Sequence, residues 1–153
     1  MMLIKRLTLV AVVTLGFMTS AGAGERGNLE EAKALVKKAR AYIQTVGPEK
    51  AFTEFNNPKG QFRDRDLYIF VHDTDGLEMA NGGNPRLVGK NVAELRDVDG
   101  VYITKGMTEA ARKGGGTLHY KFRDPVSGSI MEKVGYAELE GNFVVGSGVH
   151  LVH

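Results

Sequence analysis

The chain has 153 residues, of which 42% are hydrophobic and 25% are charged, enough for one compact domain with a buried core. Its 20 Lys and Arg nearly balance its 18 Asp and Glu, which argues against a nucleic-acid-binding protein, because such proteins carry a basic surface. No cysteine is present, and this excludes disulfides, thiolate metal sites and covalently attached c-type haem.

The N-terminal segment predicts export. Lys5 and Arg6 precede an apolar run over 7–18, the length of the hydrophobic region of a secretory signal and too short for a spanning helix of about 20 residues. Ala21-Gly22-Ala23 offers a small-residue cleavage site. We expect cleavage after Ala23, which leaves residues 24–153 as a single periplasmic domain with no net charge.

Two helices are predicted next. Asn28 and Glu31 form a capping-box pattern, so a long amphipathic helix begins there. Its apolar residues recur at spacings of three and four: Leu29, Ala32, Leu35, Val36, Ala39, Tyr42, Ile43 and Val46. Pro48 starts a second, short helix that runs to Phe55.

From Leu67 onward the pattern changes to the period of two that is typical of strands. The predicted elements are a strand over 67–73, a turn, a strand over 77–80, a short helix over 91–95, a helix over 101–113, and strands over 117–123, 129–139 and 142–149. Tight turns make consecutive strands antiparallel, and the helical crossover lets both groups join one sheet. We therefore predict an α+β fold, with a five-stranded antiparallel sheet, the long helix on one face and a pocket on the crossover side.

One strand face carries polar and aromatic groups. Tyr68, Phe70 and His72 alternate with plain aliphatic residues, so they share one side of the strand over 67–73. On the strand over 129–139, Lys133 shares its face with Gly135 and Ala137, which leave room around it. Lys133 is either a solvated surface charge or a cationic anchor for a small anion.

Other chemistries find less support. The Asp73-Thr74-Asp75-Gly76 stretch lacks the ligand spacing of a calcium loop and predicts a hairpin turn. His72 and His119 would form a two-histidine metal or haem site if their strands were adjacent, and this alternative stays open. An enzyme acting in the same pocket is a further alternative, although no catalytic motif is present.

Four stretches together resemble a known family. They are DLYIFVHDTDG over 66–76, NPRLVGKN over 84–91, KVGY over 133–136 and VVGSGV over 144–149. They resemble single Cache domains of the second subtype, the extracytoplasmic sensory modules of bacterial chemoreceptors and histidine kinases. The resemblance spans about residues 29 to 151. It implies a PAS-like fold that binds small carboxylates such as acetate, propionate, pyruvate or lactate, without catalysis and without a cofactor.

The resemblance also implies roles for residues. Tyr68, Phe70 and His72 would form a pocket wall, and Lys133 would be the partner of the ligand's carboxylate. Tyr136 matches the family's strand but has the opposite parity to Lys133. His119 is a further candidate ligand-binding residue, not from the resemblance but because its strand could lie beside that of His72.

Two departures from the family pattern concern the pocket. Asn81-Gly82-Gly83 stands where the family commonly has a His-Pro pair, so closure of the pocket by this loop is an open question. His150 stands where a tyrosine is common. Because no output domain follows Val152-His153, we expect a free-standing protein that acts through a partner, such as a membrane receptor or histidine kinase, and that can form a homodimer through its long helix.

Overall fold

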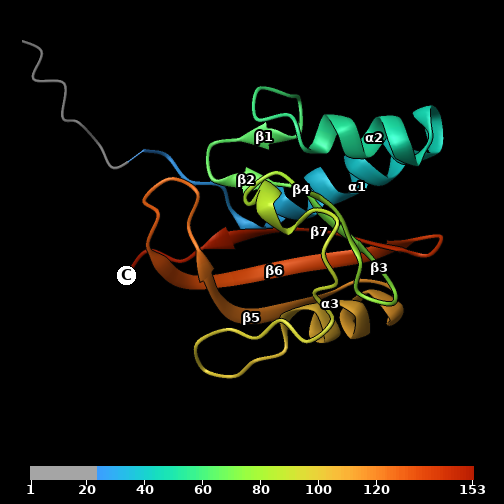
Figure 1. Cartoon of the computed structure of the whole chain (residues 1–153). Coiled ribbons are helices and arrows are strands. Elements are labelled where there is room, and N and C mark those ends of the chain that lie inside the picture. The colour runs from blue at the N-terminus through green and yellow to red at the C-terminus, as the bar shows by residue number, and fades with distance from the viewer. Residues whose placement is uncertain (1–23) are drawn as a thin grey trace, which may run out of the picture.

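The computed structural model describes residues 24–153, and the predicted signal segment over 1–23 lies outside the described residues. Three α-helices flank a sheet: α1 (Leu29–Val46) and α2 (Pro48–Phe55) on one side, and α3 (Ile103–Arg112) on the other (Figure 1). The remaining elements are β1 (Arg63–Asp64), β2 (Leu67–Tyr68), β3 (Phe70–Asp73), β4 (Glu78–Asn81), the 3₁₀ helix η1 (Pro85–Leu87), β5 (Gly116–Arg123), β6 (Ile130–Glu140) and β7 (Phe143–His150).

The main sheet has five antiparallel strands in the order β4-β3-β7-β6-β5, as predicted. The last strand, β7, lies between β3 and β6 and joins the two halves of the sheet. Cross-strand pairing places candidate residues in two rows. His72 pairs with Val144, and Lys133 pairs with Tyr120 on one side and His150 on the other.

The capping box predicted at the start of α1 is present. The Asn28 side chain accepts from the Glu31 backbone N–H at 3.0 Å, and the Glu31 carboxylate accepts from the Asn28 N–H at 2.8 Å. Two otherwise unpaired backbone donors are thus satisfied. The apolar stripe of α1 faces the sheet through its buried residues Ala32, Val36, Ala39 and Ile43.

The strand predicted over 67–73 is divided in two. Its first part, β2, pairs with the short β1 in a separate two-stranded sheet, and only β3 joins the main sheet. Between them the Ile69 carbonyl accepts from the Gly82 N–H at 3.0 Å. The chain therefore stays extended, and the alternation of its side chains persists from Leu67 to His72.

The short helix predicted over 91–95 is wrong. The Asn91 side chain accepts from the Ala93 N–H at 2.9 Å, which stabilises a turn in place of a helix. The 3₁₀ helix η1 lies earlier in this loop, where Asn84 accepts from the Arg86 N–H at 3.3 Å. The segment from η1 to α3 crosses the face of the sheet that α1 leaves uncovered (Figure 1).

The two faces of the sheet bury separate cores, as the alternation predicts. Ile69 and Val71 lie in the cluster formed with α1 and α2. Phe70 lies in the opposite cluster with Met107 and Val144, on the α3 side. Burial on both faces fixes the strand register, because a slip of one residue would exchange the two sets.

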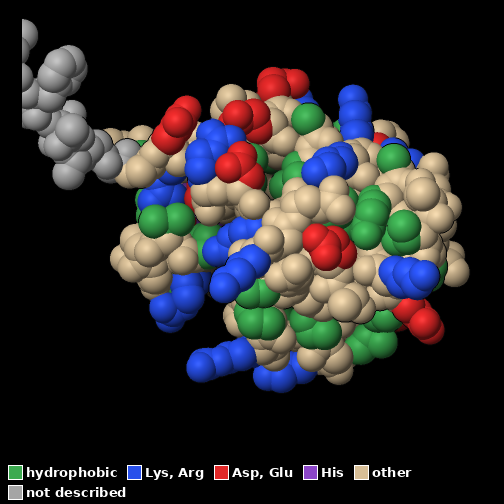
Figure 2. Space-filling model, turned by 90° about the horizontal axis from the view of Figure 1, so that it is seen from above, with side chains coloured by type: hydrophobic (Ala, Val, Ile, Leu, Met, Phe, Trp, Pro, Cys, Tyr) green, Lys and Arg blue, Asp and Glu red, His purple; other side chains and the backbone are tan. Residues whose placement is uncertain are grey.

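The outer surface carries both signs of charge. Figure 2 shows Lys and Arg side chains interspersed with Asp and Glu side chains on the face seen from above, with hydrophobic side chains in small separate groups. Within residues 24–153, no helix combines the length and the apolar character needed to cross a membrane.

Candidate ligand-binding pocket

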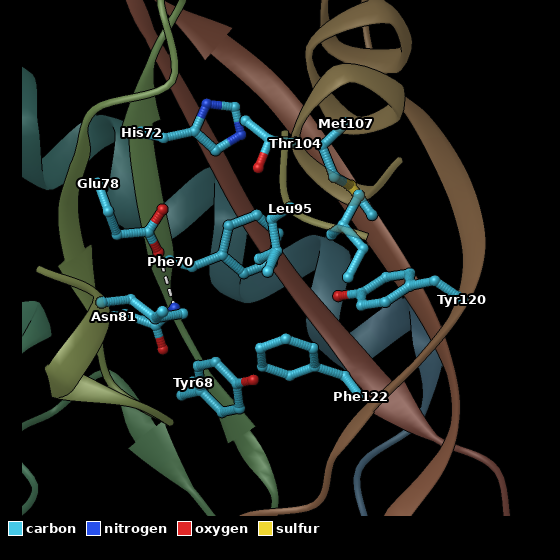
Figure 3. A pocket seen from close by; sticks show the side chains of 12 residues that line it. Tyr68, Phe70, His72, Glu78, Asn81, Leu95, Thr104, Met107, Tyr120 and Phe122 are labelled. Atoms are coloured by element: carbon cyan, nitrogen blue, oxygen red, sulfur yellow. Dashed lines mark hydrogen bonds between the residues drawn. The ribbon is translucent and has the colours of Figure 1, made fainter. Parts of the chain in front are cut away.

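A pocket lies between the sheet and the crossover segment, on the side predicted from the sequence. Its walls come from β2, β3, β4, η1, α3 and β5 (Figure 3). The lining residues are Tyr68, Phe70, His72, Glu78, Asn81, Leu87, Leu95, Ile103, Thr104, Met107, Tyr120 and Phe122. The volume open to the centre of a water molecule is about 30 Å³, and one water needs about 10–15 Å³ on this measure. The space suits a ligand of few non-hydrogen atoms.

The face Tyr68, Phe70 and His72 lines this pocket. All three side chains are buried, with exposed fractions of 2%, 8% and 2%. Phe70 lies at the centre of the view in Figure 3, with His72 and Tyr68 toward opposite ends. The wall is thus apolar in the middle and polar at both ends.

Lys133 is not among the lining residues: it is buried behind Tyr68 and borders a separate surface hollow that includes His119. Its exposed fraction is 1%, so it is not a solvated surface charge. Its ammonium donates to the Tyr68 hydroxyl at 2.7 Å and lies 4.2 Å from the centre of that ring. Because the Tyr68 oxygen accepts this bond, the hydroxyl proton of Tyr68 is left for another acceptor. Burial lowers the pKa of Lys133 to about 7, against the opposing effect of nearby Asp66 and Asp124.

Space for the lysine comes from a glycine on the neighbouring strand. A Cβ on Gly148 would lie 2.9 Å from Cε of Lys133 and 2.6 Å from the Val134 carbonyl oxygen. The second contact is with a backbone atom of β6, which cannot move aside without disturbing the sheet. The absence of a side chain at Gly148 therefore leaves the space that the lysine stem occupies.

Tyr136 does not line the pocket. It projects from the other face of β6, where its hydroxyl donates to Glu138 at 2.7 Å and the Lys33 ammonium lies 5.7 Å from its ring centre. Parity is the reason, since residues an odd number of positions apart on a strand face opposite sides. The expectation that Tyr136 contributes to the pocket is therefore corrected.

His119 is also outside this pocket. It is exposed and borders a separate surface hollow with Asp97 and Lys121. Strands β7 and β6 separate its strand from that of His72. The two-histidine metal or haem site is therefore excluded by the topology, and residues 24–153 hold no cluster of three or more His, Cys, Asp or Glu arranged for a metal ion.

The tautomer of His72 is set by its backbone. Its Nδ1 lies 2.9 Å from the Asp73 carbonyl oxygen, and because a carbonyl only accepts, Nδ1 carries the proton. Burial lowers the pKa of His72, which keeps the ring neutral. Its Nε2 is then a hydrogen-bond acceptor, buried and without a partner. In Figure 3 this nitrogen points toward Thr104.

Glu78 and Asn81 complete the polar wall, and sequence reasoning missed both. Spaced three apart, they would face opposite sides of a regular strand. The register of β3 and β4 shifts between Val71 and His72, so that His72 pairs with Glu78 while Phe70 pairs with Asn81. This β-bulge turns both side chains into the pocket, where the Asn81 amide donates to Glu78 at 2.7 Å (Figure 3). The sequence offered only an acid among the apolar residues Leu77, Met79 and Ala80, and this pattern does not show that the acid faces the pocket.

Burial also governs the charge of Glu78. Its exposed fraction is 4%, and desolvation raises its pKa to about 7 despite the bond from Asn81. A carboxyl of this pKa is partly protonated near neutral pH. The pocket therefore contains an acid, Glu78, and a lysine lies behind Tyr68. The charge of each of these two groups changes near pH 7.

The loop that replaces the family's His-Pro pair packs onto the pocket. Asn81 Oδ1 accepts from the Gly83 and Asn84 N–H groups at 3.1 and 2.8 Å, which closes the turn. A Cβ on Gly83 would lie 2.3 Å from Cζ of Tyr68, so only glycine lets the loop approach this ring. The loop covers Tyr68 in the structure as it stands.

A group of buried charges lies beside Lys133. Arg26 donates in bidentate geometry to Asp124 at 3.0 and 2.9 Å and lies 3.5 Å from Asp66. The bond from Arg26 holds the pKa of Asp124 well below its usual range. His150, the residue where the family often has tyrosine, lies 3.7 Å from Asp124 and 4.0 Å from Asp66. Burial and the nearby Lys133 lower the pKa of His150 to about 4.

Comparison with known proteins identifies the family. The family model described as Single Cache domain 2 matches residues 11–151, most of the chain. This chain belongs to the single Cache domain 2 family. The outcome confirms the resemblance stated from the four sequence stretches, and the members of this family are extracytoplasmic sensor domains.

Curated relatives of this Cache domain are parts of larger signalling proteins. It is 33% identical over 89 residues to the sensor histidine kinase MctS of Rhizobium johnstonii, covering 57% of this chain and 19% of that protein. It is 32% identical over 90 residues to the methyl-accepting chemotaxis protein CtpM of Pseudomonas aeruginosa, covering 57% of this chain and 16% of that protein. The matched part is thus under a fifth of each relative.

Solved structures share its fold. A methyl-accepting chemotaxis protein from Vibrio parahaemolyticus superposes with a TM-score of 0.66 and 26% identity, over 79% of this chain and 86% of that one. A Cache chemosensory domain whose structure explains carboxylic acid recognition superposes with a TM-score of 0.68 and 22% identity, over 80% and 92% of the two chains. These neighbours are sensory domains of the Cache and PAS-like type.

Proposed function

We propose that this Cache domain is a periplasmic sensor for a small carboxylate and that it acts through a partner protein. The observation that carries the proposal is the hydrogen bond from buried Lys133 to Tyr68, whose ring lines one end of a narrow pocket. A carboxylate that accepts from the Tyr68 hydroxyl would sit close to the lysine charge in a site shielded from water, where such bonds are strong. The carboxylic acid recognition described for a neighbour of the same fold supports this ligand class.

The proposed partner is a chemoreceptor or a histidine kinase, because the relatives are proteins of these two kinds. Export through cleavage after Ala23 is part of the proposal. So is a homodimer through α1, whose outward face carries exposed Lys37, Ala41 and Gln44. Analytical ultracentrifugation of residues 24–153 tests for the dimer. If the protein sediments as a monomer at all concentrations, the proposed homodimer is wrong.

Thermal-shift titration tests the ligand class. Acetate, propionate, pyruvate and lactate are added separately to purified residues 24–153. A ligand at 100 times its dissociation constant should raise the free energy of unfolding by about 2.7 kcal/mol. If none of the four acids moves the melting temperature at millimolar concentration, the proposed function is wrong.

Replacing Lys133 with Met should abolish this response. Met has a similar length and removes both the charge and the hydrogen bond to Tyr68, so we expect the affinity for every responding carboxylate to fall at least tenfold. The variant should remain folded, because the relief of the desolvation cost of the buried lysine offsets the loss of its bond to Tyr68. Calorimetric titration measures the affinity, and urea unfolding measures the stability.

The matched control is Lys121→Met on the neighbouring strand, where the lysine pairs with Asp99 at the surface. This variant should bind as the wild type does. A Lys133→Met protein that retains wild-type affinity would show that the ligand does not use the Lys133–Tyr68 end.

A further inference from the structure

Two buried ionisable groups at the pocket have no counter-ion. The Glu78 carboxyl lines the pocket, is 4% exposed, and has one side-chain partner, the neutral amide of Asn81 (Figure 3). Lys133 is 1% exposed, and its amino group has one hydrogen bond, to the neutral hydroxyl of Tyr68. Within residues 24–153, neither group has an oppositely charged partner within the 4.0 Å of an ion pair. The charged form of each group is therefore costly.

The surroundings of Lys133 leave its charge finely balanced. Three aromatic rings lie around its amino group, with centres 4.2, 5.8 and 6.0 Å away, namely those of Tyr68, Phe122 and Tyr120. The more distant charges that act on it are Asp66 and Asp124, which favour the ammonium, and Arg63, which opposes it. Burial outweighs the two carboxylates and brings the pKa of Lys133 to about 7.

The neighbours of Glu78 in the pocket are neutral. Its carboxyl accepts from Asn81, and it pairs across β3 with His72, whose ring is neutral because burial lowers its pKa. Burial raises the pKa of Glu78 itself to about 7. Its charge acts as far as the Tyr68 hydroxyl, where burial and then Glu78 raise the pKa of the phenol. An ionised Glu78 would therefore repel a carboxylate at the Tyr68 end without touching it.

A carboxylate at the Tyr68 end changes both proton equilibria in the same direction. A nearby anion favours the charged form of a base and the neutral form of an acid. We propose that the pocket takes up a proton with the carboxylate that it binds, as Glu78 becomes neutral and Lys133 becomes charged. The domain then responds to the concentration of the acid and to the pH of its surroundings together. The inference rests on the proposed function and adds a second input to it.

The size of the uptake follows from linkage. At pH 7 each of the two groups is about half ionised in the free protein, so complete conversion of both takes up about one proton per ligand. The other groups around the lysine keep their protonation near pH 7, because burial raises the pKa of the tyrosines and lowers that of the histidine: Tyr68, Tyr120 and His150.

The affinity for the carboxylate should therefore depend on pH. Binding raises the pKa of both groups, and a group whose pKa rises on binding favours the complex at low pH. We expect the affinity to fall about tenfold between pH 7 and pH 8, because about one proton is taken up there. Between pH 5.5 and pH 6.5, where Lys133 is already charged and Glu78 already neutral, the change should be about twofold.

Calorimetric titration in two buffers tests the proposal on purified residues 24–153. The ligand is whichever of acetate, propionate, pyruvate and lactate gives the largest thermal shift. PIPES and imidazole both buffer at pH 7 and differ in their enthalpy of ionisation, so the difference between the two observed binding enthalpies gives the number of protons taken up. We expect about one proton per ligand.

A Glu78→Gln variant removes one of the two groups and keeps the shape of the side chain. It should take up about half as many protons at pH 7 and bind more tightly than the wild type at pH 8. The matched control is Glu94→Gln, whose exposed carboxylate pairs with Lys105, and it should match the wild type in both. Should Glu78→Gln fail to fold, ¹³C shifts of wild-type protein at pH 7 report the same changes. Saturation with the acid should move Cδ of Glu78 toward the neutral acid and Cε of Lys133 toward the ammonium.

The outcomes separate the two proposals. If none of the four acids binds at millimolar concentration, the proposed function fails. If an acid binds with no uptake of protons and with equal affinity at pH 7 and pH 8, the carboxylate sensor stands and the proton-uptake inference is overturned. Release of protons on binding, or full wild-type uptake by Glu78→Gln, would also overturn it.

Discussion

Replacing Arg26 with Met is expected to lower the free energy of unfolding by about 3 kcal/mol, the low end for breaking a buried ion pair. The low end applies because the Arg26 side chain is 22% exposed, whereas the Asp66 and Asp124 side chains it balances are fully buried. Without the guanidinium, Asp124 loses its bidentate partner and Asp66 loses its ion pair, while both carboxylates stay buried. Urea unfolding at pH 7 measures the change.

The same variant should show a characteristic dependence on pH. His150 is neutral in the wild type, and Arg26 is one of the charges that lower its pKa, together with Lys133. Without Arg26 the pKa of His150 rises, and protonation then places a cation between Asp66 and Asp124. A raised native pKa stabilises the protein at low pH, so the loss in Arg26→Met should be smaller at pH 5 than at pH 8.

Lys113→Met serves as the control, since its ion pair with Glu109 lies on the surface of α3. The unfolding midpoint of this protein should match the wild type. An Arg26→Met protein that also unfolds with the wild-type midpoint would show that the N-terminal segment does not hold the buried acids.

Replacing Glu78 with Gln is expected to stabilise the protein at alkaline pH and to leave it nearly unchanged in acid. The pKa of Glu78 is about 7 in the native state and 4.5 in the unfolded state. Between pH 4.5 and pH 7, Glu78 is therefore protonated in the native protein and ionised in the unfolded chain. Stability from this group is therefore complete below pH 4.5 and is lost as the pH rises through 7. The difference between the two pKa values corresponds to about 3 kcal/mol in the free energy of unfolding.

Gln keeps an oxygen that can accept from Asn81 and carries no charge. The free energies of unfolding of Glu78→Gln and wild type should converge near pH 4 and differ most at pH 8, where the variant is more stable. Glu94→Gln on the exposed crossover segment is the matched control and should follow the wild-type curve. Parallel curves for Glu78→Gln and wild type would mean that Glu78 stays ionised in the native protein.

Local rules predicted much of the fold. The capping box at Asn28 and the alternation from Leu67 to His72 each depend on neighbouring residues alone, and both are present. The helix expected over 91–95 failed because the side chain of Asn91 competes for the backbone, which apolar spacing does not reveal. The alternation of side chains along a strand already placed Tyr136 and Lys133 on opposite faces of β6, and they lie on opposite faces in the structure.

The pocket was predictable only in part. The strand face with Tyr68 and His72 follows from its period. Lys133 stood out by its small neighbours on β6, and the structure buries it behind Tyr68, outside the lining of the pocket. Glu78 depends on a bulge whose position no local pattern marks. Arg26 meets Asp124 across 98 positions in the chain, a contact that arises only when the sheet is assembled. Long-range geometry therefore decides which charges the ligand meets.

The bulge in β4 has a consequence for how such a pocket can diversify. β4 is the outermost strand of the main sheet and has a single neighbour in it, so a change in its length disturbs one ladder only. An insertion or deletion there exchanges the side chains offered to the ligand, while Lys133 on β6 and Tyr68 on β2 keep their places. The preference for a ligand can then evolve through changes in the length of β4 as readily as through substitutions, while the other strands of the sheet stay unchanged.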